Sequence, residues 1–419
     1  MSTSPTSGIP RSSGVTPLTP VFGVTILNSI STTILTTAIY FLTESAYHFD
    51  RTQNYVLGVV MGVTYILGSV AAGRVLRLTR GLKRPIGDRS VLAAIILGMT
   101  GACAIPYLFR GESSWPIWLH VCLYSPLSGM LWPIVESYLS GGREGERLRS
   151  ALGRWNVGWS LAGACGAVFV SPLVKEHALL GILLFGAAHL ASLGFLPWFT
   201  KMPGTHHADT PRAHPPVYKD LLTAFRIMLP VAYLVVNTLM PYLPSAMRRV
   251  GVMDGWQTAL VAIYLFSRAA TFLGLELWTG WHGKWRLAIA GASLIVGGFG
   301  VIVSAGWFGS GLGLAVLVSG LIAFGVGMSA IYVGAIYYAM EVSHSEVDAG
   351  GAHEALIGVG YTAGPLCGLV ATVVATRALG DGGSIEPLLL AVVGLVAAAT
   401  AGLVFKRVHH HTARSRGPG

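Results

Sequence analysis

Apolar runs of about twenty residues follow one another along almost the whole chain, and each is long enough to cross about 30 Å of hydrocarbon as a helix. Only 11% of the 419 residues are charged, against about 25% in a soluble domain. The alternation of apolar and polar residues over about ten positions that a membrane β-barrel needs is absent, as in 180–188. The chain is therefore predicted to be an all-α integral membrane protein.

The length criterion predicts about twelve transmembrane helices. The longest interior break, 201–219, is polar and rich in proline, and it is predicted to be a cytoplasmic linker between bundles at 17–200 and 220–406. Residues 1–16 are predicted to be a flexible tail and 407–419 a basic tail. The predicted spans are 18–43, 53–73, 90–109, 116–139, 151–174, 178–200, 220–245, 256–279, 287–306, 310–340, 350–376 and 386–405.

A short pattern recurs at about half the chain length. Val157-Gly158-Trp159-Ser160, with Cys165-Gly166 after it, returns about 200 residues later as Val359-Gly360-Tyr361-Thr362 with Cys367-Gly368. Such a period in a chain of membrane helices indicates two copies of one bundle, giving two pseudo-symmetric six-helix halves. The copies fall on the fifth and eleventh predicted spans.

Lysine and arginine are concentrated in the loops of one face, in the second-to-third and fourth-to-fifth loops and after residue 405. That face is predicted to be cytoplasmic, with both termini on it, in the cell (inner or plasma) membrane. The basic residues lie in short loops between spans, so the net charge of +10 does not point to nucleic acid. The chain is expected to act as a monomer in the lipid bilayer.

Two halves, a long central loop and a basic second-to-third loop resemble the major facilitator superfamily. The segment from Pro133 to Glu136, the stretch Arg149 to Gly153 and the glycines of 163–166 are similar to its fourth helix, the following loop and its fifth helix. The signature loop after Gly73 keeps its basic residues but lacks the acid, and Asp88 comes too late to replace it. The resemblance implies a secondary transporter of unassigned subfamily.

Arg268 is the strongest candidate for binding a substrate. It lies near the middle of the eighth predicted span, too deep to reach the interface easily, and no acid is predicted at the same depth. A guanidinium there suggests an aqueous cavity and an anionic ligand, because its planar fork suits carboxylate or phosphate. Hydrogen bonds from Arg268 to backbone carbonyls are the alternative interpretation.

Other polar and aromatic residues are predicted to complete the substrate site. The resemblance implies that the first, fourth, seventh and tenth helices line the cavity and that the fifth and eleventh support them. Asn28 and Asn237 are therefore expected to face the cavity from opposite halves. Bonding to a neighbouring helix is an equal alternative for each asparagine. The aromatic candidates, suited to amphipathic solutes, are Trp132, Tyr264, Tyr332 and Tyr337.

Glu136, Arg149 and Arg154 are predicted to form an acid–base cluster at the inner mouth, to which the resemblance assigns gating. Glu354 is placed in the same gating and coupling group. Arg154 and Glu354 lie within one or two turns of a span end, so snorkelling to the interface is the competing interpretation. Simple anchoring of the loop and contact with substrate also remain open for the cluster.

The sequence lacks signatures of enzymes, ATP-driven pumps, cofactors and metal sites. The neighbouring histidines His206-His207 and His409-His410-His411 do not resemble a buried metal site. The sequence favours a transporter moving a small, acidic or phosphate-bearing solute by alternating access, with protons as the expected coupling ion. Proton-driven efflux of amphipathic compounds is one alternative, although it needs a titratable acid in the cavity. A non-transporting membrane scaffold or sensor is the other.

Overall fold

The computed structural model describes residues 14–204, 214–342, 347–380 and 384–415, and every regular element in these ranges is helical. The N-terminal half contains α1 (Leu18–Thr33), the π-helix η1 (Ile34–Ala38), α2 (Ile39–Tyr47), α3 (Arg51–Arg80), α4 (Asp88–Leu108), α5 (Trp115–Ser140), α6 (Gly145–Val170), η2 (Ser171–Leu173), α7 (Ala178–Ser192) and η3 (Leu193–Trp198). The C-terminal half contains α8 (Val217–Leu239), η4 (Met240–Tyr242), α9 (Leu243–Arg249), α10 (Asp254–Leu277), α11 (Trp285–Ser304), η5 (Ala305–Phe308), α12 (Ser310–Val342), α13 (Val347–Leu379) and α14 (Glu386–Ser415).

Eleven of the described helical segments are long and apolar enough to cross a membrane. The remaining predicted span is the fourth, which is α5; its 26 residues give it the length, but its tryptophans, prolines and serines keep it outside the eleven. The prediction of an all-α membrane protein with about twelve spans is therefore confirmed.

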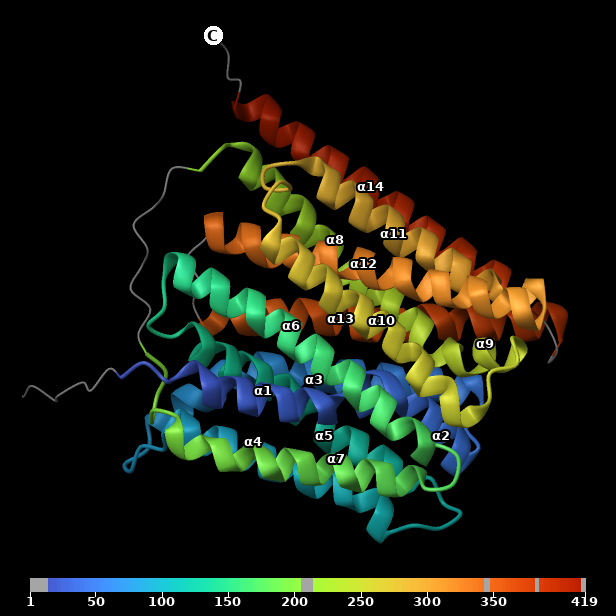
Figure 1. Cartoon of the computed structure of the whole chain (residues 1–419), viewed down its shortest axis with the longest axis horizontal. Coiled ribbons are helices and arrows are strands. Elements are labelled where there is room, and N and C mark those ends of the chain that lie inside the picture. The colour runs from blue at the N-terminus through green and yellow to red at the C-terminus, as the bar shows by residue number, and fades with distance from the viewer. Residues whose placement is uncertain (1–13, 205–213, 343–346, 381–383, 416–419) are drawn as a thin grey trace, which may run out of the picture.

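The two halves lie side by side, blue to green for the first and yellow to red for the second (Figure 1). Helix α3 packs along α13, and α6 packs along α10, so these two pairs form the boundary between the halves. The described parts of both chain ends lie on the same side, which we call the termini face. The other end of the bundle is called the opposite face.

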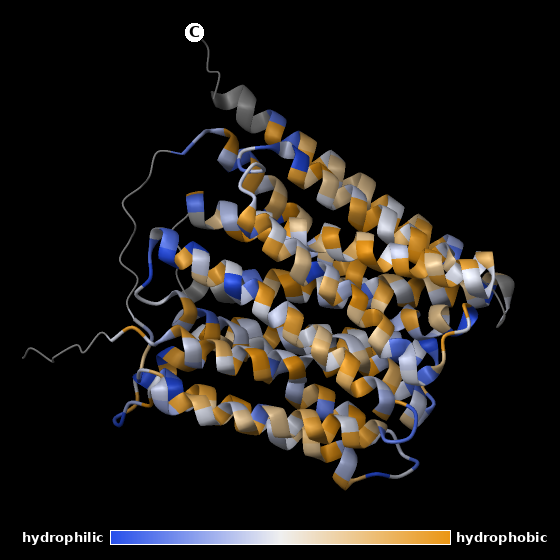
Figure 2. Cartoon of the chain, viewed as in Figure 1, coloured by the Kyte–Doolittle hydropathy of each residue, from blue (hydrophilic) through white to orange (hydrophobic). Residues whose placement is uncertain are grey.

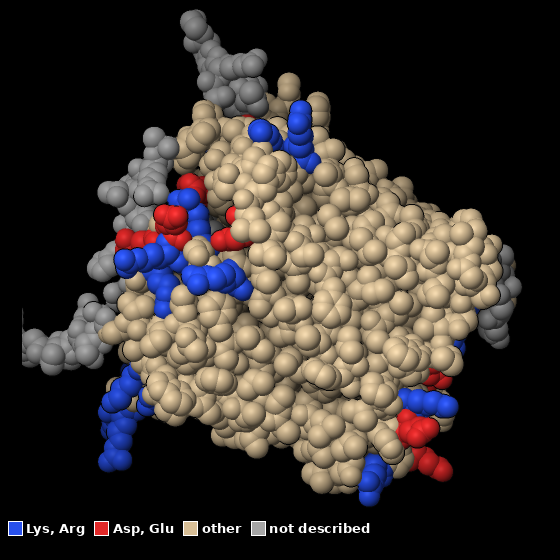
Figure 3. Space-filling view, viewed as in Figure 1, with Lys and Arg blue, Asp and Glu red and all other residues tan. Residues whose placement is uncertain are grey.

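On the face drawn in Figure 3, exposed charged residues gather at the two ends of the helices. Figure 3 shows Lys, Arg, Asp and Glu at the termini face and at the opposite face, with a wide uncharged surface between them. Apolar residues are distributed over the same belt in Figure 2. This distribution is what a hydrocarbon layer requires, because ionised side chains are excluded from it.

Two spans that correspond in the repeat are interrupted near the middle of the molecule. The first span changes from α-helix to π-helix over Ile34–Ala38 and continues as α2. The seventh span tightens to a 3-10 turn over Met240–Tyr242, where Pro241 occupies an early position, and continues as α9. Each interruption leaves a short outer segment that ends at the opposite face.

The connection from α2 to α3 shows how local sequence sets these boundaries. His48 has a positive φ of 53° and ends α2. Two residues later Asp50 caps α3: its carboxylate accepts the Gln53 backbone N–H at 2.7 Å, and the Gln53 side chain accepts the Asp50 N–H at 2.9 Å. This capping box fixes the direction in which α3 enters the bundle.

The predicted tails and linker differ in part from the structure. Most of the predicted N-terminal tail (1–13), residues 205–213 of the linker and 416–419 lie outside the described residues. Thr16 is buried, and its hydroxyl forms a 2.7 Å hydrogen bond with that of Thr200, so the end of the predicted flexible tail is held. Helix α14 runs to Ser415, so the predicted basic tail is helical over its described part.

Candidate functional site

A central cavity of about 130 Å³ lies where the two halves meet. Its wall combines hydroxyls, aromatic rings and two opposite charges, which distinguishes it from an apolar packing defect. The π-helical segment contributes Thr36 and Thr37, as expected where such a segment serves a site. The other lining residues are Ser29, Thr32, Thr33, Tyr65, Trp132, Trp155, Trp159, Gly163, Tyr233, Val236, Asn237, Met240, Tyr264, Leu265, Arg268, Tyr332, Glu354, Ile357 and Tyr361.

Arg268 of α10 lies in this wall with only 4% of its surface exposed. Its Nη1 donates to the Tyr264 hydroxyl at 3.0 Å, while Nε and Nη2 have no hydrogen-bond partner among the described residues. The guanidinium carbon stands 4.6 Å from the ring centre of Trp159, which comes from α6 in the other half. The rings of Phe272 and Tyr332 are within 6.0 Å.

The charge of Arg268 is only partly compensated by these rings. A charged side chain deep in the hydrocarbon costs roughly 2.5–3.5 kcal/mol on insertion scales. A desolvated cation–π contact returns about 2 kcal/mol. No acid forms an ion pair with Arg268 in the described part of the chain. An anionic group entering the cavity would therefore stabilise the site.

Glu354 of α13 lines the same cavity and is 5% exposed. Its Oε2 accepts a 2.5 Å hydrogen bond from the Tyr65 hydroxyl of α3, which joins the two halves. The prediction that no acid shares the depth of Arg268 is therefore wrong. Snorkelling of Glu354 is excluded as well, because the carboxylate is buried against Tyr65 rather than at the interface. Glu136 of α5 lies within electrostatic range of Glu354.

Of the predicted substrate residues, Trp132, Asn237, Tyr264 and Tyr332 line the cavity together with Arg268. Asn237 also donates to the Tyr233 carbonyl at 2.7 Å.

Asn28 does not face the cavity. Its amide nitrogen donates to the Ser192 hydroxyl at 2.9 Å, and its Oδ1 lies 2.7 Å from Nδ1 of His189, whose Nε2 meets the Tyr124 hydroxyl at 2.7 Å. The side chain is thus fully used in joining α1 to α7 inside the N-terminal half. The alternative interpretation of a bond to a neighbouring helix describes it correctly.

Tyr337 is also outside the central cavity. It lies nearer the termini face, in a second cavity of about 280 Å³ between α6, α10 and α12. The ring of His282 stacks on it with the ring centres 4.2 Å apart, and Trp281 packs at 4.9 Å. Position on the tenth span predicted a lining role, but the cavity wall ends near Tyr332, about one turn earlier.

The predicted cluster of Glu136, Arg149 and Arg154 is not assembled. Nε of Arg149 lies 3.2 Å from Oε1 of Glu341 at the end of α12, so its acidic partner comes from the other half. Arg154 is exposed and donates to the Ser150 carbonyl at 3.2 Å, in agreement with the interfacial interpretation. Glu136 lies deeper, toward Glu354.

Contacts join the two halves on both sides of the cavity. At the termini face the contact is the Arg149–Glu341 ion pair. At the opposite face Glu44, near the end of α2, forms an ion pair with Arg248, near the end of α9. Between the cavity and that face the Tyr55 hydroxyl of α3 donates to the Thr238 carbonyl at 3.2 Å.

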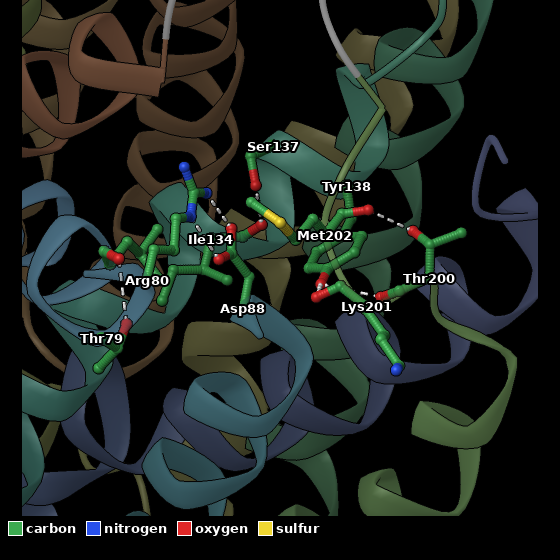
Figure 4. A network of polar contacts seen from close by, with 10 residues as sticks. Thr79, Arg80, Asp88, Ile134, Ser137, Tyr138, Thr200, Lys201 and Met202 are labelled. Atoms are coloured by element: carbon green, nitrogen blue, oxygen red, sulfur yellow. Dashed lines mark hydrogen bonds and ion pairs between the residues drawn. The ribbon is translucent and has the colours of Figure 1, made fainter. Parts of the chain in front are cut away.

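The basic loop of the first half also holds an acid. Asp88 begins α4, is fully buried, and accepts from Nε of Arg80 at 2.9 Å; the two also form an ion pair (Figure 4). The Tyr138 hydroxyl of α5 donates to the Thr200 carbonyl at 3.1 Å in the same network. Asp88 therefore fixes the end of α3 against α4, in a different position from the acid of the signature loop.

Several cavity residues were missed by the sequence analysis. Trp159 and Tyr361 occupy corresponding places in the two copies of the repeat, and both line the cavity, so the fifth and eleventh spans do more than support it. The repeat was the signal that identified these positions. His353, which is not part of the lining, was missed as well; its ring lies 6.1 Å from that of the lining residue Tyr332, and its Nε2 is buried without a partner among the described residues.

A helical membrane protein with a cavity between two related halves has the architecture of a secondary transporter. Residues 21–365 match the Major Facilitator Superfamily, and the chain belongs to this superfamily. No curated protein sequence matches the chain.

Solved structures with the same fold are transporters of low sequence identity. A bacterial homologue of the human lysosomal transporter Spinster, inward-facing and unoccupied, has a TM-score of 0.68 and 14% identity, covering 96% of this chain and 99% of that one. The nucleoside transporter NupG has a TM-score of 0.66 and 10% identity, covering 93% of this chain and 98% of that one. The human organic anion transporter MFSD10 (TETRAN) has a TM-score of 0.59 and 16% identity, covering 93% of this chain and 100% of that one. These likenesses confirm the fold, and the family supports membrane transport.

Proposed function

We propose that the chain transports a small organic anion by alternating access, with the anion bound to Arg268 in the central cavity. The observation that carries this proposal is a buried guanidinium that forms no ion pair among the described residues and is held between aromatic rings of both halves. An anionic substrate supplies the missing charge, and the rings of Trp159 and Tyr332 accommodate an apolar body. The substrate would contact both halves, as exchange between two access states requires.

Glu354 supports protons as the coupling ion. Its carboxyl group lies in the same cavity as Arg268, and Tyr233, Tyr332 and Tyr361 are within electrostatic range of both groups. Uptake of a proton on Glu354 leaves the positive charge of Arg268 unopposed in the cavity and favours anion binding. Release of the proton has the reverse effect, so the two binding events are linked.

The test is counterflow of a panel of organic anions in vesicles containing the purified protein. Arg268→Ala is expected to weaken binding at least about 30-fold, because losing one member of a buried charge pair costs about 2 kcal/mol or more. Arg268→Lys keeps the charge without the fork and is expected to recover part of the activity. Arg110→Ala, in an exposed loop, is the matched control. Normal transport of every anionic substrate by both Arg268 variants would contradict the proposal.

Proton-driven efflux of amphipathic compounds is a second candidate function, favoured by one observation. The titratable acid that such a mechanism needs is present as Glu354 in a cavity rich in aromatic rings. Drug susceptibility of cells lacking the protein distinguishes the two: hypersensitivity to cationic or neutral amphipathic drugs, without a defect in anion uptake, supports efflux. The alternative of a non-transporting scaffold or sensor receives no support from the family or from the central cavity.

The membrane orientation is also part of the proposal. The Lys- and Arg-rich loops belong to the termini face, and under the positive-inside rule this supports a cytoplasmic location for that face. Protease protection of tags at the two ends, in intact and inverted vesicles, tests this orientation.

A further inference from the structure

A large apolar cavity is separate from the central one and opens toward the membrane. It is a groove of about 910 Å³ between α8, α11 and α14. Its wall is almost wholly apolar, with Val231, Ala292 and Ala401 as typical members, and it has Trp285 and His409 at the end nearest the termini face. A groove of this composition does not hold water, and inside a bilayer it is filled by apolar chains.

Weak packing of α14 produces the groove. Only 11% of the most apolar window of this helix is buried, while the corresponding windows of the other ten qualifying spans are 39–61% buried. Figure 1 shows α14 along the edge of the C-terminal half, beside α11. The helix therefore contacts its neighbours along part of one side and leaves a space between itself and α8.

Four cations surround the end of the groove at the termini face. Lys284 and Arg286 flank the start of α11, and Lys406 and Arg407 lie on α14 just before His409. All four side chains are exposed, and none forms an ion pair among the described residues. Figure 3 shows basic side chains over this part of the molecule, with uncharged surface beside them.

We propose that the groove binds one anionic phospholipid of the leaflet at the termini face. Its acyl chains lie between α8, α11 and α14. Its phosphate contacts the four cations Lys284, Arg286, Lys406 and Arg407. Charge complementarity decides between the possible occupants. An apolar helix of a second copy of the protein could also fill the groove. Its cations would then lie against the four cations of the first copy and repel them. Each Lys or Arg near an anionic headgroup contributes independently to binding, whereas a zwitterionic headgroup has no net charge to attract them.

The test uses the full-length chain purified in a neutral detergent and titrated with phosphatidylglycerol or phosphatidylcholine. Thermal unfolding and native mass spectrometry are measured, because a lipid that binds only the folded state raises the unfolding temperature. We expect one phosphatidylglycerol to be retained and the unfolding temperature to rise, with a much smaller rise for phosphatidylcholine. Equal effects of the two lipids would overturn the proposal, and so would a dimer that retains no phospholipid.

Two pairs of variants separate the headgroup contact from the groove. Lys406→Gln with Arg407→Gln is expected to weaken phosphatidylglycerol binding about 30-fold, since each of the two cations accounts for about fivefold. The control, Lys83→Gln with Arg84→Gln, removes two exposed cations from the loop between α3 and α4. Unchanged binding in the first double variant, or equal loss in both, would contradict the headgroup assignment.

The second pair fills the groove itself. Ala401→Trp places an indole among the lining residues, whereas Ala398→Trp adds the same bulk to an exposed position of α14 outside the lining. Loss of the retained lipid in the first variant alone supports the groove as the binding site. Retention by both variants would overturn it. Anion counterflow is measured in parallel, and its outcome bears on the proposed function without deciding the lipid site.

Discussion

The close contact between α3 and α13 gives a prediction about the closed state of the transporter. A methyl group added at Gly62 would lie 2.5 Å from the backbone nitrogen of Thr362 in the other half. Because the obstacle is backbone, Gly62→Ala forces the two helices apart, and overpacking of this kind costs about 1–3 kcal/mol. We expect this contact to be lost when the halves separate toward the opposite face. We therefore expect the closed population to fall about 5- to 150-fold relative to the open one.

The assay is labelling of Thr36→Cys, which lines the cavity, in a background whose four native cysteines are replaced by serine. A membrane-impermeant maleimide added at the opposite face should react faster in the Gly62→Ala variant, in proportion to the open population. Gly101→Ala is the control, since a methyl group there meets nothing within 4 Å. An unchanged labelling rate, in a variant that unfolds at the normal temperature, would refute the argument that this contact closes the cavity.

Three further predictions concern charge. Arg149→Glu should favour opening at the termini face by up to about fivefold, as expected for a part-exposed ion pair, and adding Glu341→Arg should restore the original distance distribution between spin labels on the two halves. Glu354→Gln should abolish the pH dependence of transport while leaving anion exchange; persistence of a normal pH profile would exclude Glu354 as the proton site. Burial lowers the pKa of His282, with Arg149 adding to the effect and Glu341 opposing it. The folded protein therefore favours the neutral His282 ring, and stability is lost as the pH falls below the ordinary histidine pKa of about 6.5. The drop in unfolding temperature between pH 7 and pH 5 should be smaller in His282→Gln than in the unchanged protein.

The membrane fold could be predicted because span length and the half-chain repeat are properties of the chain itself. Arg268 could be identified for a similar reason, since a central charge in a long apolar run has few structural explanations. The partners could not be predicted. Glu354 appeared interfacial because its helix was predicted to begin at residue 350, and its burial depends on Tyr65 of the other half. Asn28 has its hydrogen bonds satisfied by Ser192 and His189, which no spacing along the sequence reveals.

The prediction of an acid–base cluster at the inner mouth was wrong for a related reason. A short loop brings Glu136 and Arg149 onto neighbouring helices, but the depth of each side chain decides whether they meet. The partner of Arg149 is Glu341, at the end of α12 in the other half. Contacts between the halves depend on how two bundles are docked, and hydropathy along one chain carries no information on that docking.

The interruptions at η1 and η4 affect how motion of this protein should be measured. Each separates a short outer segment, of nine residues in α2 and seven in α9, from the long helix below it. Glu44 and Arg248 join the tips of these two segments. A probe pair on the tips therefore reports bending at the interruptions together with rotation of the halves. Probes on α3 and α13, which continue without a break, report the rotation alone, and the difference between the two distances isolates the bending.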